Sequence, residues 1–417
     1  EMYFSRFSGG VQRVDCATNA LAGTSIAVGA NPLGICYDST NNRIIFMWGS
    51  TSTTDCGAAT TYCLLTQYRD FSTASASNST VKMVGLASTT EASVPTEGEV
   101  NYISAHKRYY VVTANSSNNI TWYSMPDTWT NWSGENILIN STTGAHPNML
   151  YNDLGVYYQT SAALSHFVKL PSFNQAGYRF FTNNNSAQIG SALAGQNTPA
   201  TAPAQGTLFR MRLLVNNASI SAPMAISSAS FKLQFAGKGG GSCASPAGVP
   251  LSYTDISTTT SISFGDNDSI ADGIAHTASP ASDPFAGSPE HASTSQTYEE
   301  ANNFINSQSA IASGSDAIWD FALKDLDADA STVFCTRAVY SDNGGTIDKY
   351  DQYPEITTAA AAGARFTQND FRFYADNNVL DPTDPWGNPD LGENAVLTVI
   401  PARNDPPASG SEIRIRM

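Results

Sequence analysis

Three acidic stretches are the strongest candidates for metal-binding chemistry in this sequence. The carboxylates within each stretch lie two to five residues apart: Asp325, Asp327 and Asp329; Asp266, Asp268 and Asp272; Asp376, Asp381 and Asp384. Oxygen-rich loops of this kind suit Ca²⁺, although "DLDADAS" around Asp327 lacks the glycine turn and the terminal glutamate of an EF-hand loop. The alternative is a solvated turn between strands, which favours the same residue types. Calcium is therefore the predicted cofactor, with the candidate ligands Asp325, Asp327, Asp329, Asp266 and Asp268.

Three tryptophans are candidates for contacts with sugar rings. Trp122 precedes the segment "SMPDTWTNW", and Trp129 and Trp132 lie within it. Flat aromatic rings stack on sugars when they are exposed, but in a strand-rich chain they more often pack one sheet against its neighbour. Glycan contact is thus the functional prediction for these residues, and packing is the alternative.

The six cysteines predict disulfides rather than a zinc site. None forms a C-x-x-C pair, and no histidine stands at zinc-finger spacing from them. An even number of cysteines in a chain of this composition is typical of an oxidising compartment. The preferred pairings, each within one structural unit, are Cys16–Cys36, Cys56–Cys63 and Cys243–Cys335, and buried free thiols are the alternative.

The sequence contains no recognisable catalytic motif. A G-x-S-x-G elbow and an H-E-x-x-H motif are absent, and "GKGGGS" (residues 237–242) has the character of a hairpin turn rather than of a phosphate-binding loop. The five histidines are scattered, at His106, His146, His166, His276 and His291. Catalytic residues can be remote in sequence, so this pattern predicts a protein that is not an enzyme without disproving an active site.

Composition and charge narrow the possible classes of function further. The 417 residues carry a net charge of −15, and no cluster of Lys and Arg could neutralise a row of phosphates, which argues against nucleic acid. Acidic surfaces rich in Ser and Thr are common on secreted proteins. No run of eighteen apolar residues predicts a membrane span. The strand-like start "EMYFSRF" indicates that a leader was removed or that the chain is an internal part of a longer one.

Hydrophobic patterning predicts antiparallel strands from about residue 173 to residue 358. Apolar residues alternate with polar ones in "TLFRMRLLV", "SFKLQFAGK" and "AIWDFALKD". The residues predicted to face the core of a two-sheet sandwich are Phe209, Met211, Leu213, Phe231, Leu233, Phe235, Trp319, Phe321 and Leu323. The same rule places Arg210 and Arg212 in water. A bridge between Cys243 and Cys335 would then join the two sheets.

One helix is predicted in this section. "TYEEANNFI" begins at Thr297, and Glu300 stands three residues further on, as in a capping box. The Pro- and Ser-rich "ASPASDPFAGSPEHAST" before it is predicted to be a long surface loop.

Three hairpin units are predicted before residue 171. Each has a proline, an apolar strand, a polar turn (residues 39–42, 104–107 and 152–155) and a second strand. Pro32, Pro95 and Pro147 are 63 and 52 residues apart, which fits sheets of about four strands. The first unit, "VDCATNALAGTSIAVGANPLGICYD", resembles the YVTN family of β-propeller repeats, and "YVVTAN" and "HPNMLYN" are weaker echoes of it. The resemblance implies propeller blades, and three blades are too few to close a ring.

One phrase of the sequence occurs twice. "FNQAGYRFFTNNN" (173–185) returns as "FTQNDFRFYADNN" (366–378), offset by 193 residues, so that Arg179 is matched by Arg372 and Phe180 by Phe373. Further along, "GTLFRMR" is echoed by "GSEIRIR". Together with "SFKLQFA", "WDFAL" and "VFCTRAV", the phrase resembles β-sandwich repeats of large bacterial surface proteins of the S-layer and adhesin kind. This resemblance implies architecture and location, and no activity.

The sequence therefore predicts an all-β protein with four parts. They are a partial β-propeller-like section (1–171), an antiparallel Ig-like β-sandwich (172–358), a linker (359–365) and the first strands of a second, incomplete sandwich (366–417). We expect an extracellular structural or adhesive protein of the cell surface, part of a stalk, lattice or filament. Its partners would be copies of itself or further repeats of the same chain, which would complete the last sandwich by strand addition.

Two other functions are compatible with the sequence. The first is a glycan- or ligand-binding surface module that uses the propeller face. The second is a secreted hydrolase whose catalytic residues lie outside these 417 residues.

Overall fold

The computed structural model describes most of the chain. The described residues are 2–6, 10–15, 20–21, 26–27, 32–50, 53–56, 63–70, 79–86, 98–114, 119–139, 147–149, 154–159, 165–219, 222–244, 250–276, 291–301, 304–360, 372–375 and 413–416. Their regular structure is almost entirely β-strand, and the short helix α1 covers Thr53–Cys56. The chain divides into two compact units, Glu1–Ala359 and Ala360–Met417. The predicted all-β fold class is confirmed at this level.

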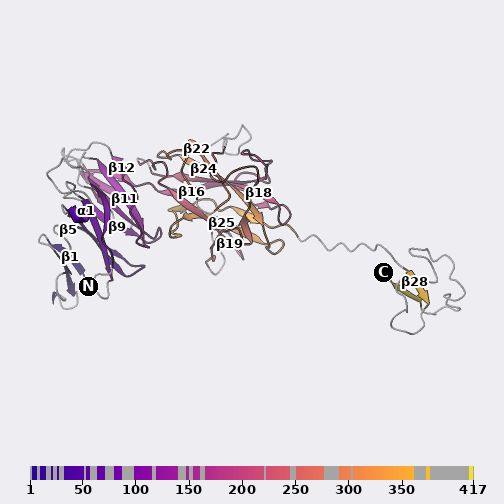
Figure 1. Ribbon diagram of the computed structural model, residues 1–417, viewed down its shortest axis with the longest axis horizontal. Helices are drawn as coiled ribbons and strands as arrows, with labels where there is room; N and C mark the ends of the chain where they lie inside the picture. The colour runs from indigo at the N-terminus through magenta and orange to yellow at the C-terminus, as the bar shows by residue number, and fades with distance from the viewer. Residues whose placement is uncertain are drawn as a thin grey trace. The chain divides into compact units, whose positions relative to one another are not determined.

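Four small antiparallel sheets follow one another at the start of the first unit (Figure 1). The first contains β1 (Met2–Arg6), β2 (Gly10–Asp15), β3 (Ala20–Leu21) and β4 (Ile26–Ala27). The second contains β5 (Pro32–Asp38), β6 (Arg43–Ser50), β7 (Cys63–Asp70) and β8 (Lys82–Leu86). The third contains β9 (Gly98–Ile103), β10 (Arg108–Ala114), β11 (Ile120–Pro126) and β12 (Asn136–Ile139). The fourth contains β13 (Asn148–Met149), β14 (Gly155–Gln159) and β15 (Ser165–Lys169).

The second and third sheets are meanders in which each strand pairs with the next one along the chain. The predicted turns at 39–42 and 104–107 join β5 to β6 and β9 to β10, as expected. In the first turn, Asp38 accepts hydrogen bonds from the backbone N–H groups of Thr40 and Asn41, each at 2.9 Å. Asn42 then takes the left-handed conformation, with φ of 53°, which asparagine tolerates better than most residues. Part of the third predicted turn lies outside the described residues.

Apolar side chains stack these sheets on one another. One buried cluster lies between the second and third sheets and includes Cys36, Met47, Val100, Tyr109 and Trp129. The opposite face of the third sheet contributes Tyr110, Val112 and Trp122 to a larger cluster that also contains the fourth sheet. The same cluster continues without a break into the strands after residue 172.

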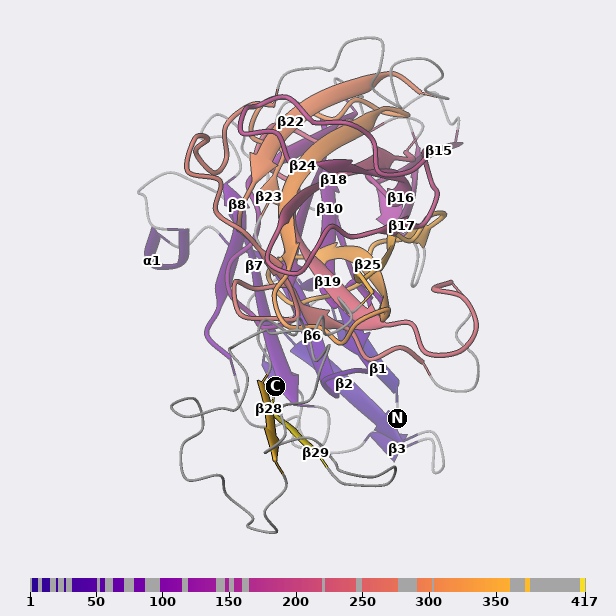
Figure 2. The ribbon, with the colours of Figure 1, turned by 90° about the vertical axis from the view of Figure 1, so that its right-hand side faces the viewer.

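Two six-stranded sheets form the rest of the first unit (Figures 1 and 2). One contains β16 (Phe173–Thr182), β18 (Leu208–Asn217), β21 (Ile262–Phe264), β22 (Ser293–Glu299), β24 (Asp316–Asp325) and β26 (Lys349–Tyr350). The other contains β17 (Ala200–Thr201), β19 (Ser230–Gly237), β20 (Thr254–Asp255), β23 (Phe304–Ile305), β25 (Val333–Tyr340) and β27 (Glu355–Thr357). The two sheets enclose one core, in which Phe231 and Phe304 of the second sheet meet Trp319 of the first.

The alternation of apolar residues predicted this core correctly. Phe209, Met211 and Leu213 are buried in it, as are Phe231, Leu233, Trp319, Phe321 and Leu323. Phe235 is partly buried against the same cluster. A side-chain period of two therefore identified the inner faces of both sheets.

The outer face of β18 does not follow the prediction. Arg210 and Arg212 were expected to face water, and both have no exposed surface. The reason is that the Tyr298 side chain of the neighbouring strand β22 and the loop from residue 265 to residue 276 cover this face. The Tyr298 ring lies 4.1 Å from the Arg210 guanidinium, and Ile270 and Tyr298 pack with Ala322 of β24. The sheet is thus buried on both sides at this point, which a two-residue period within one strand cannot indicate.

The predicted helix at Thr297 is also wrong. Residues 293–299 form β22, which runs parallel to β24, and residues 304–305 form β23, which pairs with β19. The backbone of Tyr298 donates to the carbonyl of Ile274 at 2.8 Å, and its side chain is fully buried. Ladder hydrogen bonds and burial of Tyr298 therefore outweigh a local capping pattern.

The second unit contains a described strand pair, β28 (Arg372–Ala375) and β29 (Ile413–Arg416), which is antiparallel. Both strands lie within the two segments that repeat earlier sequence, 366–378 and 410–416. The repeated phrase is thus strand-forming in both of its occurrences.

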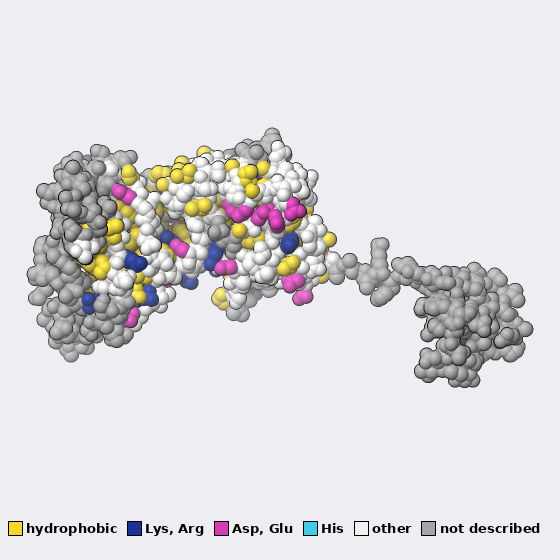
Figure 3. Space-filling model, viewed as in Figure 1, with side chains coloured by type: hydrophobic (Ala, Val, Ile, Leu, Met, Phe, Trp, Pro, Cys, Tyr) yellow, Lys and Arg dark blue, Asp and Glu magenta, His cyan; other side chains and the backbone are white. Residues whose placement is uncertain are grey.

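The described surface is acidic, and its helices offer no membrane anchor. In the face shown in Figure 3, Asp and Glu side chains gather over the two-sheet part, while Lys and Arg are scattered. Within the described ranges, no helix has the length and apolar character needed to cross a bilayer.

Candidate functional site

A close contact joins the third sheet to the two-sheet part, and we call it the joint. It consists of the turn from Ser104 to Arg108 between β9 and β10 and the loop 341–348 between β25 and β26. The carbonyl of Ala105 accepts hydrogen bonds from the backbone N–H of Thr346 at 2.8 Å and from its hydroxyl at 3.2 Å. Asn343 Nδ2 donates to the carbonyls of His106, at 3.2 Å, and Lys107. Backbone carbonyls of the turn thus accept hydrogen bonds from the loop in place of hydrogen bonds from water.

The sequence "SDNGG" shapes the loop to receive the turn. Asn343 Oδ1 accepts from the backbone N–H of Gly345 at 2.9 Å, and Gly344 takes a positive φ of 67°, which favours glycine. A Cβ atom on Gly345 would lie 1.9 Å from the carbonyl oxygen of His106. Only glycine allows the two backbones to approach this closely.

A row of hydrogen-bonded polar side chains lies behind the turn, buried at His106 and Tyr110 and partly exposed at Asp348. His106 Nδ1 is 2.8 Å from the Tyr110 hydroxyl, and His106 Nε2 is 3.2 Å from Asp348 Oδ1. The other oxygen of Asp348 accepts from the backbone N–H of Phe173 at 2.8 Å. Asp348 therefore ties the turn of the third sheet to the first strand of the two-sheet part.

Tyr110 in this row and the neighbouring Tyr340 are phenols whose pKa values are shifted. Burial raises the pKa of Tyr110 and that of Tyr340, whose ring lies 5.4 Å from the His106 ring. Both phenols therefore stay protonated at neutral pH and are poor nucleophiles and poor bases.

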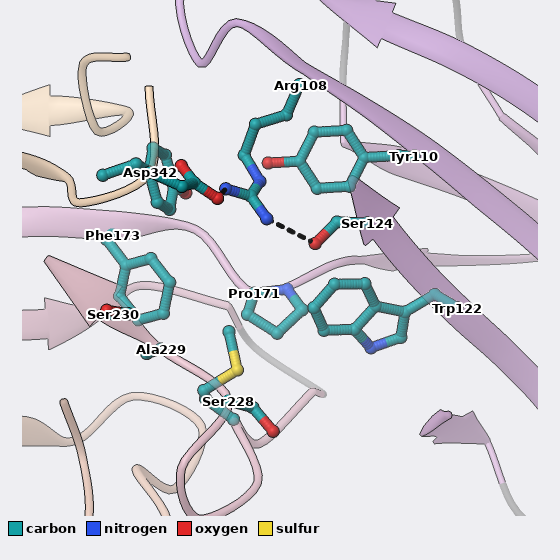
Figure 4. A pocket seen from close by; sticks show the side chains of 12 residues that line it. Arg108, Tyr110, Trp122, Ser124, Pro171, Phe173, Ser228, Ala229, Ser230 and Asp342 are labelled. Atoms are coloured by element: carbon teal, nitrogen blue, oxygen red, sulfur yellow. Dashed lines mark hydrogen bonds and ion pairs between the residues drawn. The ribbon is translucent and has the colours of Figure 1, made fainter. Parts of the chain in front are cut away.

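Arg108 makes the second ionic contact of the joint. Its Nη1 pairs with Asp342 Oδ2, and its Nη2 donates to Ser124 Oγ at 3.1 Å (Figure 4). Burial acts to lower the pKa of Arg108, but the nearby Tyr110, Asp342 and Tyr340 outweigh it and raise that pKa. The Arg108 side chain is 13% exposed and that of Asp342 is 35% exposed, so the pair is only partly shielded from solvent.

A cavity of about 70 Å³ opens beside this pair. Strands β10 and β11 supply one wall, and the two-sheet part supplies the other (Figure 4). The lining is half polar and half apolar: Arg108, Tyr110, Trp122, Ser124, Pro171, Phe173, Met224, Ser228, Ala229, Ser230, Tyr340 and Asp342. The indole N–H of Trp122 is buried and has no hydrogen-bond partner among the described residues. The space suits water or a small acceptor group, because a full sugar ring is larger.

The other two predicted sugar-binding tryptophans pack sheets together. Trp129 Nε1 donates to the carbonyl of Thr80 at 3.2 Å, and its ring meets the rings of Tyr68 and Tyr109 at 4.8 and 5.6 Å. Trp132 Nε1 donates to Thr66 Oγ1 at 2.9 Å. Both residues attach the third sheet to the second. The packing alternative thus describes Trp129, which is buried, and it also describes Trp132, which is partly buried against the same cluster.

An exposed aromatic pair lies instead on the fourth sheet. Tyr157 of β14 and Phe167 of β15 are cross-strand partners with ring centroids 4.9 Å apart. They are 46% and 41% exposed. Sequence reasoning missed them because their strands are short, and alternation with the buried Val156 and Tyr158 was the available signal.

The predicted calcium ligands do not converge. Asp325 is buried and accepts a hydrogen bond from the backbone N–H of Ala328 at 2.9 Å, which is the geometry of a turn, and Asp327 and Asp329 are exposed. Asp266 and Asp268 are exposed as well. Throughout the described segments, no three His, Cys, Asp or Glu side chains come together as a metal site would require. Asp376, Asp381 and Asp384 lie outside the described residues. Calcium binding stays a prediction without geometric support.

Two of the three predicted disulfides are present. Cys56–Cys63 joins α1 to β7, and Cys243–Cys335 joins the segment after β19 to β25, each with Cα atoms 5.6 Å apart. The second bridge lies within one sheet, because β19 and β25 are neighbours, and it does not connect the two sheets as predicted.

The predicted Cys16–Cys36 bridge is wrong. Cys36 is a free thiol buried in the cluster between the second and third sheets, and Cys16 lies outside the described residues. Burial, together with the carboxylates of Asp38 and Glu99, raises the pKa of the Cys36 thiol. The residue packs as a small apolar side chain.

Comparisons with known proteins leave the family open. No family model matches the chain, and no curated protein matches it. Among solved structures, a "Putative membrane anchored protein" from Corynebacterium diphtheriae aligns with 84% of this chain and 75% of its own, at 8% identity and a TM-score of 0.19. A TM-score this low does not show a shared fold.

Proposed function

We propose that the chain is an exported structural protein of the cell surface, built from repeated β-units that are fixed rigidly to one another. The stacked meanders would be blades of a YVTN-type propeller, and the two six-stranded sheets would be one Ig-like sandwich of a tandem array. Four successive sheets support the first assignment, and apolar clusters join the second to the third and the third to the fourth. One core enclosed by two sheets, whose long strands pair antiparallel and whose edges carry short parallel pairings, supports the second assignment.

The joint is the observation that carries this proposal. Its polar side chains hold the third sheet against the two-sheet part of the same unit, as Arg108 with Asp342 and His106 with Asp348 do. Flexible tethering would need neither these pairs nor the glycine at position 345. Rigid coupling is what a stalk or lattice requires, because slack between units would accumulate along the assembly.

The two disulfides support an oxidising compartment as the location of the protein. Cys243–Cys335 closes a loop of 92 residues, and Cys56–Cys63 closes one of 7. Loop-closure entropy would give the longer bridge roughly 4–5 kcal/mol and the shorter one roughly 2–3 kcal/mol. Bridges of this kind persist outside the reducing cytosol.

Surface proteolysis tests the location. Brief trypsin treatment of intact source cells, followed by mass spectrometry, is expected to release peptides of residues 1–359. In the native chain, Cys56, Cys63, Cys243 and Cys335 should resist alkylation until a reductant is added, whereas Cys36 should react on unfolding alone. Protection of the chain until the cells are lysed, with all thiols reduced, would overturn the proposal.

Glycan binding is the second candidate function, and the exposed pair Tyr157 and Phe167 favours it. Aromatic faces that are accessible and close together are the usual platform for sugar rings. Binding to a glycan array should then be lost in a Tyr157→Ala, Phe167→Ala double variant. A Tyr37→Ala variant serves as the control, because Tyr37 is exposed to a similar degree (39%) on a different sheet. Equal loss in both variants, or no binding by the parent, would remove this candidate.

A further inference from the structure

The strand pair of the second unit repeats a register of the first unit, position by position. In the first unit, β16 pairs with β18 as Arg179↔Arg212, Phe180↔Met211, Phe181↔Arg210 and Thr182↔Phe209. In the second unit, β28 pairs with β29 as Arg372↔Arg416, Phe373↔Ile415, Tyr374↔Arg414 and Ala375↔Ile413. The sequence repeat places the same residues in correspondence. Similar sequence and identical register together identify β28–β29 as the counterpart of β16–β18.

The first unit shows what the counterpart strand pairs with. The other edge of β18 is bound by β24, antiparallel, with Arg212 opposite Asp320, Met211 opposite Phe321 and Arg210 opposite Ala322. Arg212 Nε and Nη2 contact the two oxygens of Asp320 at 2.6 and 2.8 Å. Both side chains have no exposed surface. This bidentate ion pair allows β18 to hold a fully buried arginine on one face of the sheet.

Strand β29 carries arginines at the same two register positions, Arg414 for Arg210 and Arg416 for Arg212. Within the described segments of the second unit, β29 pairs with β28 on one edge. Its second edge corresponds to the edge of β18 that β24 occupies. The chemistry of β24 therefore predicts what the second edge of β29 accepts.

We propose that the second edge of β29 binds an extended segment of the β24 type, in which an aspartate stands opposite Arg416. The segment runs antiparallel to β29, with an aromatic residue opposite Ile415 and a small residue opposite Arg414, as in the "WDFAL" run of β24. This inference rests on the proposed function, since it names the partner through which the repeated units would associate.

Charge complementarity with Arg416 explains why the bound segment needs an aspartate at this position. An arginine enclosed by a completed sheet without a carboxylate is strongly unfavourable, whereas the matched pair is tolerated. Backbone hydrogen bonds along the strand would supply affinity for many sequences, and the aspartate supplies selectivity among them.

A peptide-binding experiment on the full chain tests the proposal. The probe is a fluorescein-labelled peptide of residues 315–326 (SDAIWDFALKDL), titrated with the chain and followed by fluorescence anisotropy. Saturable binding is expected, and a peptide with Asn at the position of Asp320 should bind roughly tenfold more weakly or worse. Arg416→Gln in the chain should cause a similar loss. The matched control Lys349→Gln removes the same charge from an exposed side chain in the first unit and should leave binding unchanged.

Each other outcome counts against the proposal. Absence of binding, equal binding of the Asp and Asn peptides, or binding that is insensitive to Arg416→Gln would each overturn it. Self-association of the chain that the peptide does not inhibit would assign this edge to a different occupant. None of these results bears on surface exposure or on the disulfides, so the proposed function can fail or hold separately.

Discussion

Asp320 lies between two fully buried arginines on the outer face of the first six-stranded sheet. It makes two short hydrogen bonds to Arg212, and its Oδ2 is 4.0 Å from Arg210 Nη1. The Arg210 guanidinium also lies 4.1 Å from the centre of the Tyr298 ring and donates to Asn183 and to the carbonyl of Ser186. Burial lowers the pKa of Arg210, against the attraction of Tyr298 and Asp320. The carboxylate thus offsets much of the cost of enclosing these charges.

Removing that carboxylate is therefore expected to destabilise the folded protein severely. Asp320→Asn should lower the free energy of unfolding by about 3–5 kcal/mol, because it leaves a buried arginine without its counter-charge. Urea denaturation followed by tryptophan fluorescence measures the change. Asp351→Asn is the control: Asp351 is 39% exposed beside Lys349, so its loss should cost less than about 1 kcal/mol. Similar losses in both variants would show that the buried pair contributes little.

Glu299 makes stability depend on pH. Burial, with a contribution from Asp272, raises its pKa from the ordinary 4.5 to about 7. Between these values the folded chain holds a proton that the unfolded chain has lost, so stability falls as pH rises through this window and stays low above it. Glu299→Gln cannot ionise and should be more stable than the parent by up to about 3 kcal/mol above pH ~8, with no difference near pH ~4.

Thermal unfolding across this pH range checks the prediction. Asp268→Asn, an exposed carboxylate in the loop near Glu299, should keep the parent profile. A parent whose stability does not fall between about pH 5 and pH 8, or a Gln variant with the same slope, would contradict the assignment.

At the scale of elements, the joint depends on the close approach of two backbones. Gly345→Ala places a Cβ against the carbonyl of His106 and should cost about 1–3 kcal/mol, because neither loop can move away without breaking the Ala105–Thr346 hydrogen bonds. Hydrogen exchange should show faster exchange at the Thr346 amide. Gly237→Ala, where the added Cβ meets no atom within 4 Å, should be neutral. Unchanged protection at Thr346 in the Gly345 variant would mean that the joint is not a fixed contact.

Local sequence predicted those elements whose residues and neighbours are close along the chain. The hairpins at 39–42 and 104–107 and the inner faces of β18 and β24 follow from turn residues and from alternation. The Cys56–Cys63 bridge is also local.

The predictions from the sequence were wrong where a segment distant along the chain covers a strand. Arg210 is buried because Tyr298, 88 residues further on, covers it, and Tyr298 itself joins a strand because β24 is beside it. Cys36 faces the neighbouring sheet, so it packs instead of pairing. The joint is similarly non-local: His106 and Asp348 are 242 residues apart, and the "NGG" turn was the single local sign of a close approach. Such contacts depend on tertiary packing that one strand's pattern does not encode.

At the scale of the whole first unit, the third and fourth sheets share one continuous core with the two six-stranded sheets. Val112, Trp122 and Val156 belong to the same buried cluster as Phe173 and Phe231. Contacts accordingly group residues 1–359 into one compact unit, although the sequence pattern changes near residue 171. The stacked sheets and the two-sheet part are thus coupled through the joint and through apolar packing around it.

This coupling predicts how the unit responds to division. Residues 172–359 expressed alone lose the joint and expose Phe173, Met224 and Tyr340, which line the cavity in the intact unit. We expect their melting temperature to fall roughly 5–10 °C below that of residues 1–359, which corresponds to about 2–3 kcal/mol for a unit of this size. Differential scanning calorimetry provides the comparison, and the Gly345→Ala variant of residues 1–359 should lie between the two. Melting of the isolated 172–359 segment at the same temperature as the intact unit would show that the two parts merely touch and that the proposed rigid coupling is absent.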